Sequence, residues 1–317
     1  MSTVQSLRMP SIAVIGVGNM GGGIAKNLLS KNYTVYVKDI DHQKTQALVQ
    51  LGAQSINSYS QLPNEVSVII ICVVTASQVG DVLKGTDQPE QTQSELGLLS
   101  ELDQRHTVIL CPTIGPTDVK GFASQIQARG ASVIDAPMSG GPVRAQMGKM
   151  SLMVACTEDV LKANDNLLHT MADPVFYISN RVGDGATTKL INNLLAGVHL
   201  VASAEAMVLA EKMGLDLQKT LDVIESSSGQ SWIGSERMRR AIHADPLQLE
   251  PLAHMTLLTK DTGLALQMGA EVDYNGPLGS KTVETFNQAC AAGLSGRDDA
   301  AMLTFLRDSA REPKLKS

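Results

Sequence analysis

The residues most able to do chemistry open a long apolar segment in the second half of the chain. The run Gly183-Asp-Gly-Ala-Thr-Thr-Lys189-Leu-Ile-Asn192-Asn193 has helical spacing. Lys189 and Asn193 are four residues apart, so they lie on one face of a helix and can address one substrate. Burying a lysine and two asparagines without partners is costly, which favours a lysine that faces a cleft. From this segment alone, a surface lysine beside helix-packing asparagines is an equal alternative.

A second chemical signal lies near the start of the chain. The run Ile12-Ala-Val-Ile-Gly-Val-Gly-Asn-Met-Gly21 places the pattern G-x-G-x-x-G between a strand-like run and a helix-like segment, 22–30. Such a turn lets the backbone approach a pyrophosphate, while the helix N-terminus offers unpaired N–H groups to it. The alternative is a chance glycine-rich turn. The pattern predicts a dinucleotide site with these cofactor-binding residues: Gly16, Val17, Gly18, Asn19, Met20 and Gly21.

An acidic residue at the end of the next strand-like run indicates which dinucleotide is bound. Asp39 lies where a carboxylate would accept hydrogen bonds from the adenosine ribose hydroxyls. A 2′-phosphate would meet like charge there, so the predicted cofactor is NAD, although Lys38 could blunt this preference. The alternative is a solvated aspartate at a strand end.

The elements that must position these residues divide the chain in two. Up to residue 179, short β-branched runs alternate with helix-like segments, which predicts a Rossmann-type doubly wound parallel sheet in an α/β domain. Beyond residue 185 apolar residues recur only at helical spacing, which predicts an all-α C-terminal domain. We place the domains at 1–182 and 183–317, and expect a solvated surface loop at 85–97. The predicted strands are Ile12–Gly16, Thr34–Lys38, Ser67–Val73, Thr107–Leu110, Ser132–Asp135, Ser151–Ala155 and Val175–Ile178. The predicted helices of the second part are Ala186–Met213, Asp216–Ser226, Ser235–Ile242, Leu252–Gly269 and Leu278–Ala292.

Composition excludes several classes of partner. The net charge of −6 and the lack of a dense Lys/Arg tract argue against nucleic acid. The apolar runs are strand-length, so we expect no membrane association. Four single cysteines without C-x-x-C spacing predict neither a zinc cage nor a disulfide framework, and hence a cytoplasmic protein. We expect no metal, because no ligand cluster is visible.

Four blocks together resemble the β-hydroxyacid dehydrogenase family, related to 3-hydroxyisobutyrate dehydrogenase and to the nucleotide domain of 6-phosphogluconate dehydrogenase. They are the 16–21 fingerprint, the run Asp135-Ala-Pro-Met-Ser-Gly-Gly141, Lys189 with Asn193, and Lys260-Asp261. The resemblance covers essentially the whole chain. Within the family, the runs 194–199, 204–207, 231–232 and 296–299 are similar to those of the L-threonate dehydrogenase branch.

The resemblance implies a division of labour at the reacting carbon. Hydride passes to the nicotinamide while Lys189 accepts the hydroxyl proton and Asn193 holds the substrate oxygen. A lysine base must be partly neutral at working pH; desolvation and neighbouring positive charge would lower its pKa. Lys260 is implied as that neighbour on the cofactor side, although a lone helical lysine is more often a solvated charge.

The resemblance also implies where the substrate acid is read. The loop Ser139-Gly140-Gly141 offers a hydroxyl and open N–H groups that can collect a carboxylate without a buried cation. Arg144 stands where many family members have glycine, and can add a cationic contact to a longer, more polar acid. For Trp232, core packing and a substrate wall are equal alternatives. Asn192 is a further substrate-side candidate, and the remaining cofactor-side candidates are Val74, Thr113, Lys260 and Asp261.

The expected function is NAD-dependent oxidation of the hydroxyl of a small, threonate-like hydroxy-carboxylic acid. The alternatives are a 3-hydroxyisobutyrate dehydrogenase, a tartronate or succinate semialdehyde reductase, or, in another class, a nucleotide-binding sensor without turnover. The family resemblance further implies a homodimer or homotetramer built through the helical half.

Overall fold

The computed structural model describes residues 9–85 and 96–310 of the chain. These residues form two compact units that divide between Lys189 and Leu190. Each unit has its own hydrophobic core, and each is described separately below.

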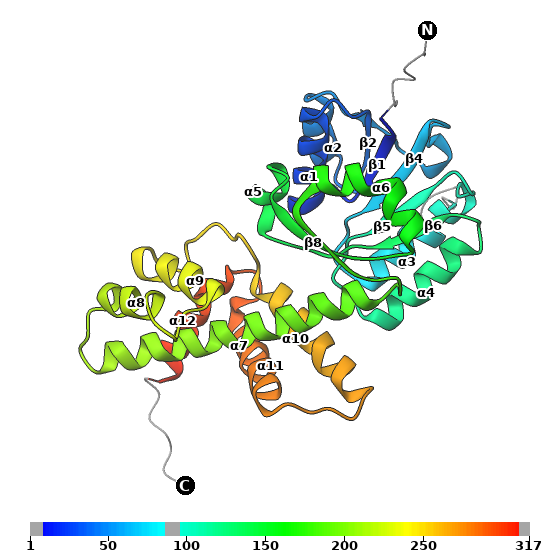
Figure 1. Cartoon of the computed structure of the whole chain (residues 1–317). Helices are drawn as coiled ribbons and strands as arrows, with labels where there is room; N and C mark the ends of the chain where they lie inside the picture. The colour runs from blue at the N-terminus through cyan, green and yellow to red at the C-terminus, as the bar shows by residue number, and fades with distance from the viewer. Residues whose placement is uncertain (1–8, 86–95, 311–317) are drawn as a thin grey trace. The chain divides into compact units, whose positions relative to one another are not determined.

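The first unit is built on one nine-stranded sheet in the order β3-β2-β1-β4-β5-β6-β8-β7, with β9 also paired to β8 (Figure 1). The strands are β1 (Ser11–Ile15), β2 (Val35–Lys38), β3 (Gln54–Ser55), β4 (Val66–Ile71), β5 (Thr107–Leu110), β6 (Ser132–Asp135), β7 (Met138–Ser139), β8 (Met150–Ala155) and β9 (Ala172–Ser179). The order reverses at β1, with β2 on one side and β4 on the other, so the Rossmann-type prediction is confirmed.

The sheet departs from the predicted parallel pattern at one edge. Strands β1 to β6 run parallel, but β8 is antiparallel to both β6 and β7. Only residues 140–149 separate β7 from β8, and a parallel crossover needs a dozen or more residues. The chain therefore turns back on itself, and a sequence pattern that reports only strand position does not reveal this reversal.

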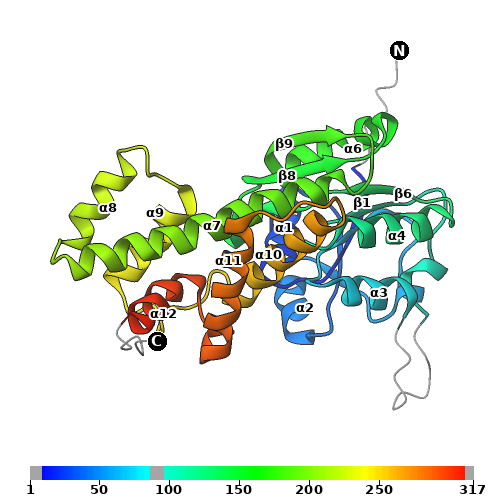
Figure 2. The same cartoon turned by 90° about the horizontal axis from the view of Figure 1, so that it is seen from below.

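Both faces of the sheet are covered by helices. Ile12 and Val14 of β1 face one hydrophobic core, whereas Ala13 and Ile15 face the other, as period-two alternation requires. Helices α1 and α6 supply apolar residues to the first core, and α3 and α4 to the second (Figure 2). The helices of this unit are α1 (Asn19–Ser30), α2 (His42–Val49), α3 (Ala76–Lys84), α4 (Pro116–Gln127), α5 (Gly141–Gln146) and α6 (Glu158–Met171).

The described residues of the second unit form helices joined by short connections, with one isolated bridge between His254 and Asp298, so the all-α prediction is confirmed. Its helices are α7 (Asp184–Lys212), which begins in the first unit, α8 (Leu217–Glu225), α9 (Trp232–His243), α10 (Met255–Ala270), α11 (Pro277–Ala289) and α12 (Met302–Ser309). Leu200, Ala204 and Met207 of α7 lie in the core with Met238 and Phe286. Among the described helices, α7 alone is long and apolar enough to cross a membrane by length and composition, but a core helix passes the same test.

Several element boundaries differ from those predicted. The predicted helix begins at Ser235, whereas α9 begins at Trp232, because Ser231 caps it by accepting a hydrogen bond from Gly234 N (3.1 Å). Strands β3 and β7 have only two residues each, too few to show a periodic pattern. Helix α12 was also missed. Residues 86–95 of the predicted 85–97 loop lie outside the described residues.

Candidate active site

The glycine-rich turn between β1 and α1 has the geometry that a pyrophosphate cradle needs. Gly16 has φ +84°, in the region that favours glycine. A Cβ on Gly21 would lie 2.0 Å from the Gly16 carbonyl oxygen, so Gly21 permits the first turn of α1 to pack on the loop. A Cβ on Gly18 would meet nothing within 4 Å, which leaves open space above the helix N-terminus. The residues present therefore fit a dinucleotide, with its phosphates on the N–H groups of this turn.

Asp39, at the end of β2, braces the same turn. Its Oδ2 accepts a hydrogen bond from Val17 N (2.7 Å), and its Oδ1 accepts one from Asp41 N (2.9 Å). Each carboxylate oxygen keeps a further lone pair, which a ribose hydroxyl could use. Lys38 instead donates to the Asn57 carbonyl, and its ammonium lies 4.9 Å from the centroid of the Tyr59 ring. These contacts turn Lys38 away from a role beside a 2′-phosphate.

The other nucleotide-side candidates in this unit follow neighbouring strands. Val74 lies just beyond β4 and is 48% exposed, and its N–H donates to Gln78 Oε1 (2.8 Å) in the cap of α3. Thr113 follows β5 and is half-buried. Both therefore lie at the carboxyl ends of adjacent parallel strands, where ligands bind in open α/β sheets.

The predicted substrate loop lies between β7 and α5. Gly140 and Gly141 have φ of +135° and +78°, so the loop depends on both glycines. Ser139, at the end of β7, is half-buried, and its carbonyl accepts a hydrogen bond from Ser151 Oγ (3.3 Å). Arg144 is exposed on α5, and its Nε donates to the Lys149 carbonyl (2.8 Å), which leaves its Nη groups for an acid.

Asp135, at the end of β6, anchors the start of α7. Its Oδ2 accepts hydrogen bonds from Gly183 N (2.8 Å) and from Ala186 N (3.1 Å), and the residue is 1% exposed. A Cβ on Gly185 would lie 3.0 Å from the Asp135 Cγ, so this contact requires glycine there. Burial raises the pKa of Asp135 to about 6, against the lowering effect of these N–H groups. Sequence reasoning missed this role, although an aspartate that ends an apolar strand signals it.

Lys189 follows this anchor by one helical turn. The residue is 6% exposed, so its amine is largely shielded from water. An anchored first turn and a shielded side chain restrict the positions that the amine can reach.

A chain of hydrogen bonds holds the polar candidates of the helical unit together. Lys260 Nζ donates to Asp261 Oδ1 (2.6 Å), and Asp261 Oδ2 accepts a hydrogen bond from Asn193 Nδ2 (2.7 Å). Asn193 Oδ1 in turn accepts one from Asn192 Nδ2 (3.0 Å). Asn193 and Asp261 are buried, so the network fixes the direction of the Asn193 amide. The sequence predicted these four residues as candidates but did not predict that they form one network.

The exposure of Trp232 excludes one of the two roles predicted for it. Its side chain is 65% exposed, so it is not a core residue of the described chain. The alternative, a substrate wall, stays a prediction.

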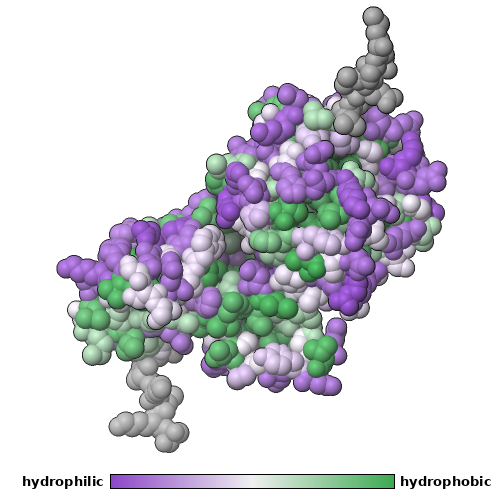
Figure 3. Space-filling model, in the orientation of Figure 1, coloured by the Kyte–Doolittle hydropathy of each residue, from purple (hydrophilic) through white to green (hydrophobic). Residues whose placement is uncertain are grey.

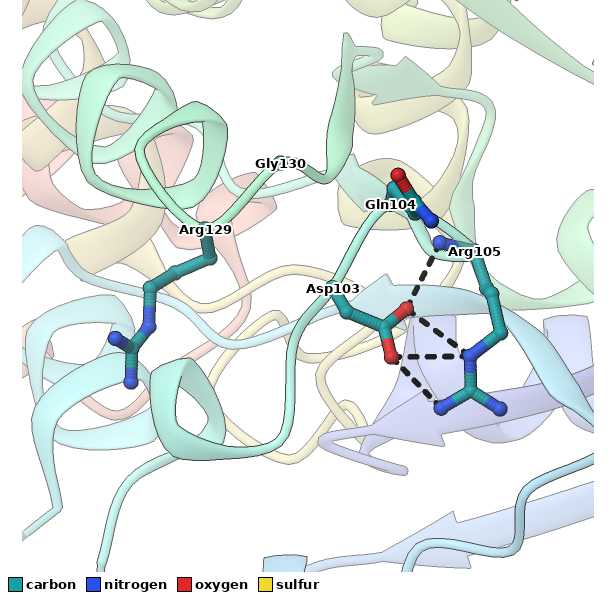
Figure 4. A pocket seen from close by; sticks show the side chains of 5 residues that line it. All are labelled: Asp103, Gln104, Arg105, Arg129 and Gly130. Carbon is teal, nitrogen blue, oxygen red and sulfur yellow. Dashed lines mark hydrogen bonds and ion pairs between the residues drawn. The ribbon is translucent and has the colours of Figure 1, made fainter.

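A surface hollow elsewhere in the first unit is not the site (Figure 4). Its lining residues precede β5 and β6, at the strand ends opposite to the glycine-rich turn. Asp103 already pairs with the Arg105 guanidinium (2.7 Å), and Arg129 Nε donates to the Leu99 carbonyl (2.6 Å). Its two cations are therefore engaged within the protein.

Two family models together match nearly all of the described chain. The family model described as the NAD binding domain of 6-phosphogluconate dehydrogenase matches residues 11–179. The model described as NAD-binding of NADP-dependent 3-hydroxyisobutyrate dehydrogenase matches residues 183–306.

Individual relatives cover nearly the whole chain. An L-threonate dehydrogenase of Haemophilus influenzae is 31% identical over 92% of this chain and 94% of the relative. The mitochondrial 3-hydroxyisobutyrate dehydrogenase of Homo sapiens is 29% identical over 94% of this chain and 87% of the relative. A crystal structure of a 3-hydroxyisobutyrate dehydrogenase from Salmonella typhimurium superposes with a TM-score of 0.82 at 30% identity, covering 93% of this chain and 99% of that one.

The cradle of β1 and α1, the Asp39 brace, and the matches over both units agree with one another. The chain belongs to the β-hydroxyacid dehydrogenase family of nicotinamide-dependent, 3-hydroxyisobutyrate dehydrogenase-like oxidoreductases.

Proposed function

We propose that the chain oxidises the hydroxyl of a small, threonate-like polyhydroxy carboxylic acid with NAD. The observation that carries this proposal is a shielded amine, Lys189, one helical turn before an amide, Asn193, whose direction is fixed by Asp261. A proton acceptor and an oriented hydrogen-bonding group on one helix are what alcohol oxidation needs. The L-threonate dehydrogenases among the relatives support this choice of acid.

In the proposed reaction, the protein handles the proton and the orientation of the acid. The bound nicotinamide supplies the hydride acceptor. Lys189 Nζ, which is shielded from water, accepts the hydroxyl proton. Asn193 uses its remaining hydrogen-bonding capacity to hold the same oxygen. Because Lys260 is paired with Asp261, we assign Lys260 to fixing Asn193, in addition to its expected place on the cofactor side.

The acid end is assigned to the first unit. Ser139, Gly140 and Gly141 offer a hydroxyl and N–H groups at a loop that two positive φ values hold open. Arg144 adds a cation whose Nε is already fixed by the Lys149 carbonyl. Together, the loop and the Arg144 guanidinium favour an acid that carries hydroxyl groups in addition to the one that is oxidised. We also assign Trp232 and Asn192 to the substrate side, and Val74 and Thr113 to the nucleotide side.

We further propose that the domains divide at 182/183, just before α7 begins, whereas the two compact units divide within α7 at 189/190. We also propose that the protein is a homodimer or homotetramer. The first family match ends at residue 179 and the second begins at 183, which supports this boundary. Exposed apolar side chains support self-association through the helical part, where Figure 3 shows apolar surface over the region of α7 and α11. These side chains are Ile191 (57% exposed), Leu195 (54%) and Leu278 (68%).

The experiment that tests the function is a screen of NAD reduction against a panel of hydroxy acids. The panel contains L-threonate, other sugar acids and 3-hydroxyisobutyrate. It also contains the hydroxy acids that are formed when tartronate semialdehyde and succinate semialdehyde are reduced. We expect the highest kcat/KM with L-threonate. A higher kcat/KM with 3-hydroxyisobutyrate would contradict the proposed substrate. If no acid supports NAD reduction, the alternative of a nucleotide-binding sensor without turnover is favoured.

The role of Lys189 is tested separately. Lys189→Ala is expected to bind NAD normally but to lose turnover, because the nucleotide contacts lie elsewhere. Lys212→Ala is the matched control: Lys212 lies at the other end of α7 and donates to the Ala310 carbonyl (3.1 Å). An equal loss of NAD affinity in Lys189→Ala would contradict the assigned role.

A further inference from the structure

Two thiols lie opposite each other where β4 and β5 end. Strands β4 and β5 are parallel neighbours in which Ile71 is opposite Leu110, so Cys72 and Cys111 are the next pair in register. Cys111 N donates to the Ile71 carbonyl (3.0 Å), which continues the ladder to this point. Opposite residues of paired strands point to the same face of a sheet, and Cys72 packs against the same hydrophobic core that contains Cys111.

The separation of the two strands suits a disulfide. Adjacent strands lie about 4.8 Å apart, and the Cα atoms of bonded cysteines are usually about 4.4–6.8 Å apart. A bond between the two sulfur atoms therefore needs a local shift of the strand ends and no rearrangement of the sheet.

The two thiols differ in access. Cys111 is 4% exposed, whereas Cys72 is half-buried. The hydrogen bond to Cys72, together with burial, raises the pKa of the Cys111 thiol well above its usual value. An oxidant in solution therefore reaches Cys72 first, and Cys111 is placed to resolve the product.

Cys72 also supports the dinucleotide turn directly. Its N–H donates to the Ile15 carbonyl (2.7 Å), at the last residue of β1. A Cβ on Gly21 would lie 2.9 Å from Cys72 Cβ, and a Cβ on Gly16 would lie 2.8 Å from the Cys72 carbonyl oxygen. Because the turn rests on Cys72 without space between them, a shift of Cys72 displaces the N–H groups that face the phosphates.

We propose that Cys72 and Cys111 are an oxidation site at which a peroxide forms a disulfide and thereby weakens NAD binding. The Cys72 thiolate attacks one peroxide oxygen; an S–O bond forms, the O–O bond breaks, and the leaving hydroxide takes up the thiol proton as water. The Cys111 sulfur then attacks Cys72; the S–S bond forms, the S–O bond breaks, and a second water leaves. Two thiols lose two electrons in total, and the peroxide is reduced to two waters. The site goes beyond the dehydrogenase activity and does not depend on Lys189.

The test treats the reduced full chain with hydrogen peroxide and measures NAD affinity by calorimetry, with peptide mass mapping of the same samples. We expect a peptide that links Cys72 to Cys111, and NAD binding weaker by at least about tenfold, since losing one hydrogen bond to a charged group costs about that much. Dithiothreitol should restore the affinity, and saturating NAD should slow the reaction because it holds the turn in place.

Two variants separate this site from general damage. Cys72→Ser should keep its NAD affinity after peroxide treatment, and Cys111→Ser should yield no linked peptide. Cys156→Ser is the matched control, since Cys156 is also buried beyond a strand end of the same unit, and it should respond like the unmodified chain. The proposal is wrong if no linked peptide forms in the unmodified chain, or if the linked protein binds NAD as tightly as the reduced one. Because the readout is NAD binding, its result is independent of the assigned acid and of the role of Lys189.

Discussion

Replacing Asp135 by asparagine tests how α7 is anchored to the sheet. Burial raises the pKa of this carboxyl from 3.8 to about 6. A raised pKa means that the unfolded chain ionises first, so folding loses free energy as pH rises from 3.8 through about 6. A rise in pKa of this size corresponds to roughly 3 kcal/mol. At neutral pH, where Asp135 is ionised, the free energy of unfolding is therefore lower by that amount than it is in acid.

An asparagine keeps the anchor and removes this charge. Both N–H groups donate to the single oxygen Oδ2, so one amide carbonyl at that place can accept both hydrogen bonds. We expect Asp135→Asn to be more stable than the unmodified chain at neutral pH, by up to roughly 3 kcal/mol, and the difference to vanish in acid below the usual aspartate pKa. Asp135→Ala leaves two buried N–H groups without an acceptor, so it should be destabilised by about 1–3 kcal/mol for each at every pH.

The assay is urea unfolding of the three proteins at a series of pH values that spans the two pKa values. The stability of the unmodified chain relative to Asp135→Asn should fall as pH rises through this range. A pH-independent difference, or an asparagine variant that is destabilised at neutral pH, would refute the reasoning that burial of charge dominates at this position.

Three further predictions concern the glycine-rich turn, the ribose contact of Asp39 and a buried ion pair. Gly21→Ala places a methyl group against the turn itself and should lower both the Tm and the NAD affinity. Gly18→Ala places a methyl group in open space, so it should weaken NAD binding and leave the Tm unchanged. Equal losses of Tm in the two variants, measured by calorimetry, would contradict this. Asp39→Arg should move the ratio of kcat/KM values from NAD toward NADP, and an unmoved ratio would disprove the ribose contact. Asp298→Ala removes a fully buried carboxylate that pairs with Arg240 (3.0 Å) and should cost about 3–5 kcal/mol in denaturant unfolding; a loss below about 1 kcal/mol would mean that this pair behaves like a surface ion pair.

The sequence predicted best where one short segment determines the geometry. The fingerprint at 16–21 and Asp39 lie within one βαβ unit, so strand, turn and acidic residue are specified locally. Likewise, strands β1, β2, β4, β5 and β6 were located to within two residues, because each is a short apolar run between turn signals.

What escaped prediction depends on contacts between distant segments. The reversal of β8 follows from the length of the connection after β7, and spacing along a strand carries no information on its direction. The contact between Asn193 and Asp261 joins residues 68 positions apart, and helical periodicity does not say which helices meet. Helix α9 begins at Trp232 because Ser231 caps it, and a pattern of apolar residues does not report such a cap.

The network that ends at Lys260 limits how this protein can evolve. The Asn193 amide donates a hydrogen bond to the Asp261 carboxylate and accepts one from the Asn192 amide. Few other side chains can replace Asn193 or Asp261 and keep this hydrogen bond between them. An aspartate at position 193 would set two carboxylates against each other, and an asparagine at 261 would remove the carboxylate that pairs with the Lys260 ammonium. Positions 193, 260 and 261 should therefore change together among homologues. A homologue with a different residue at one of these positions should carry a matching replacement at another of them.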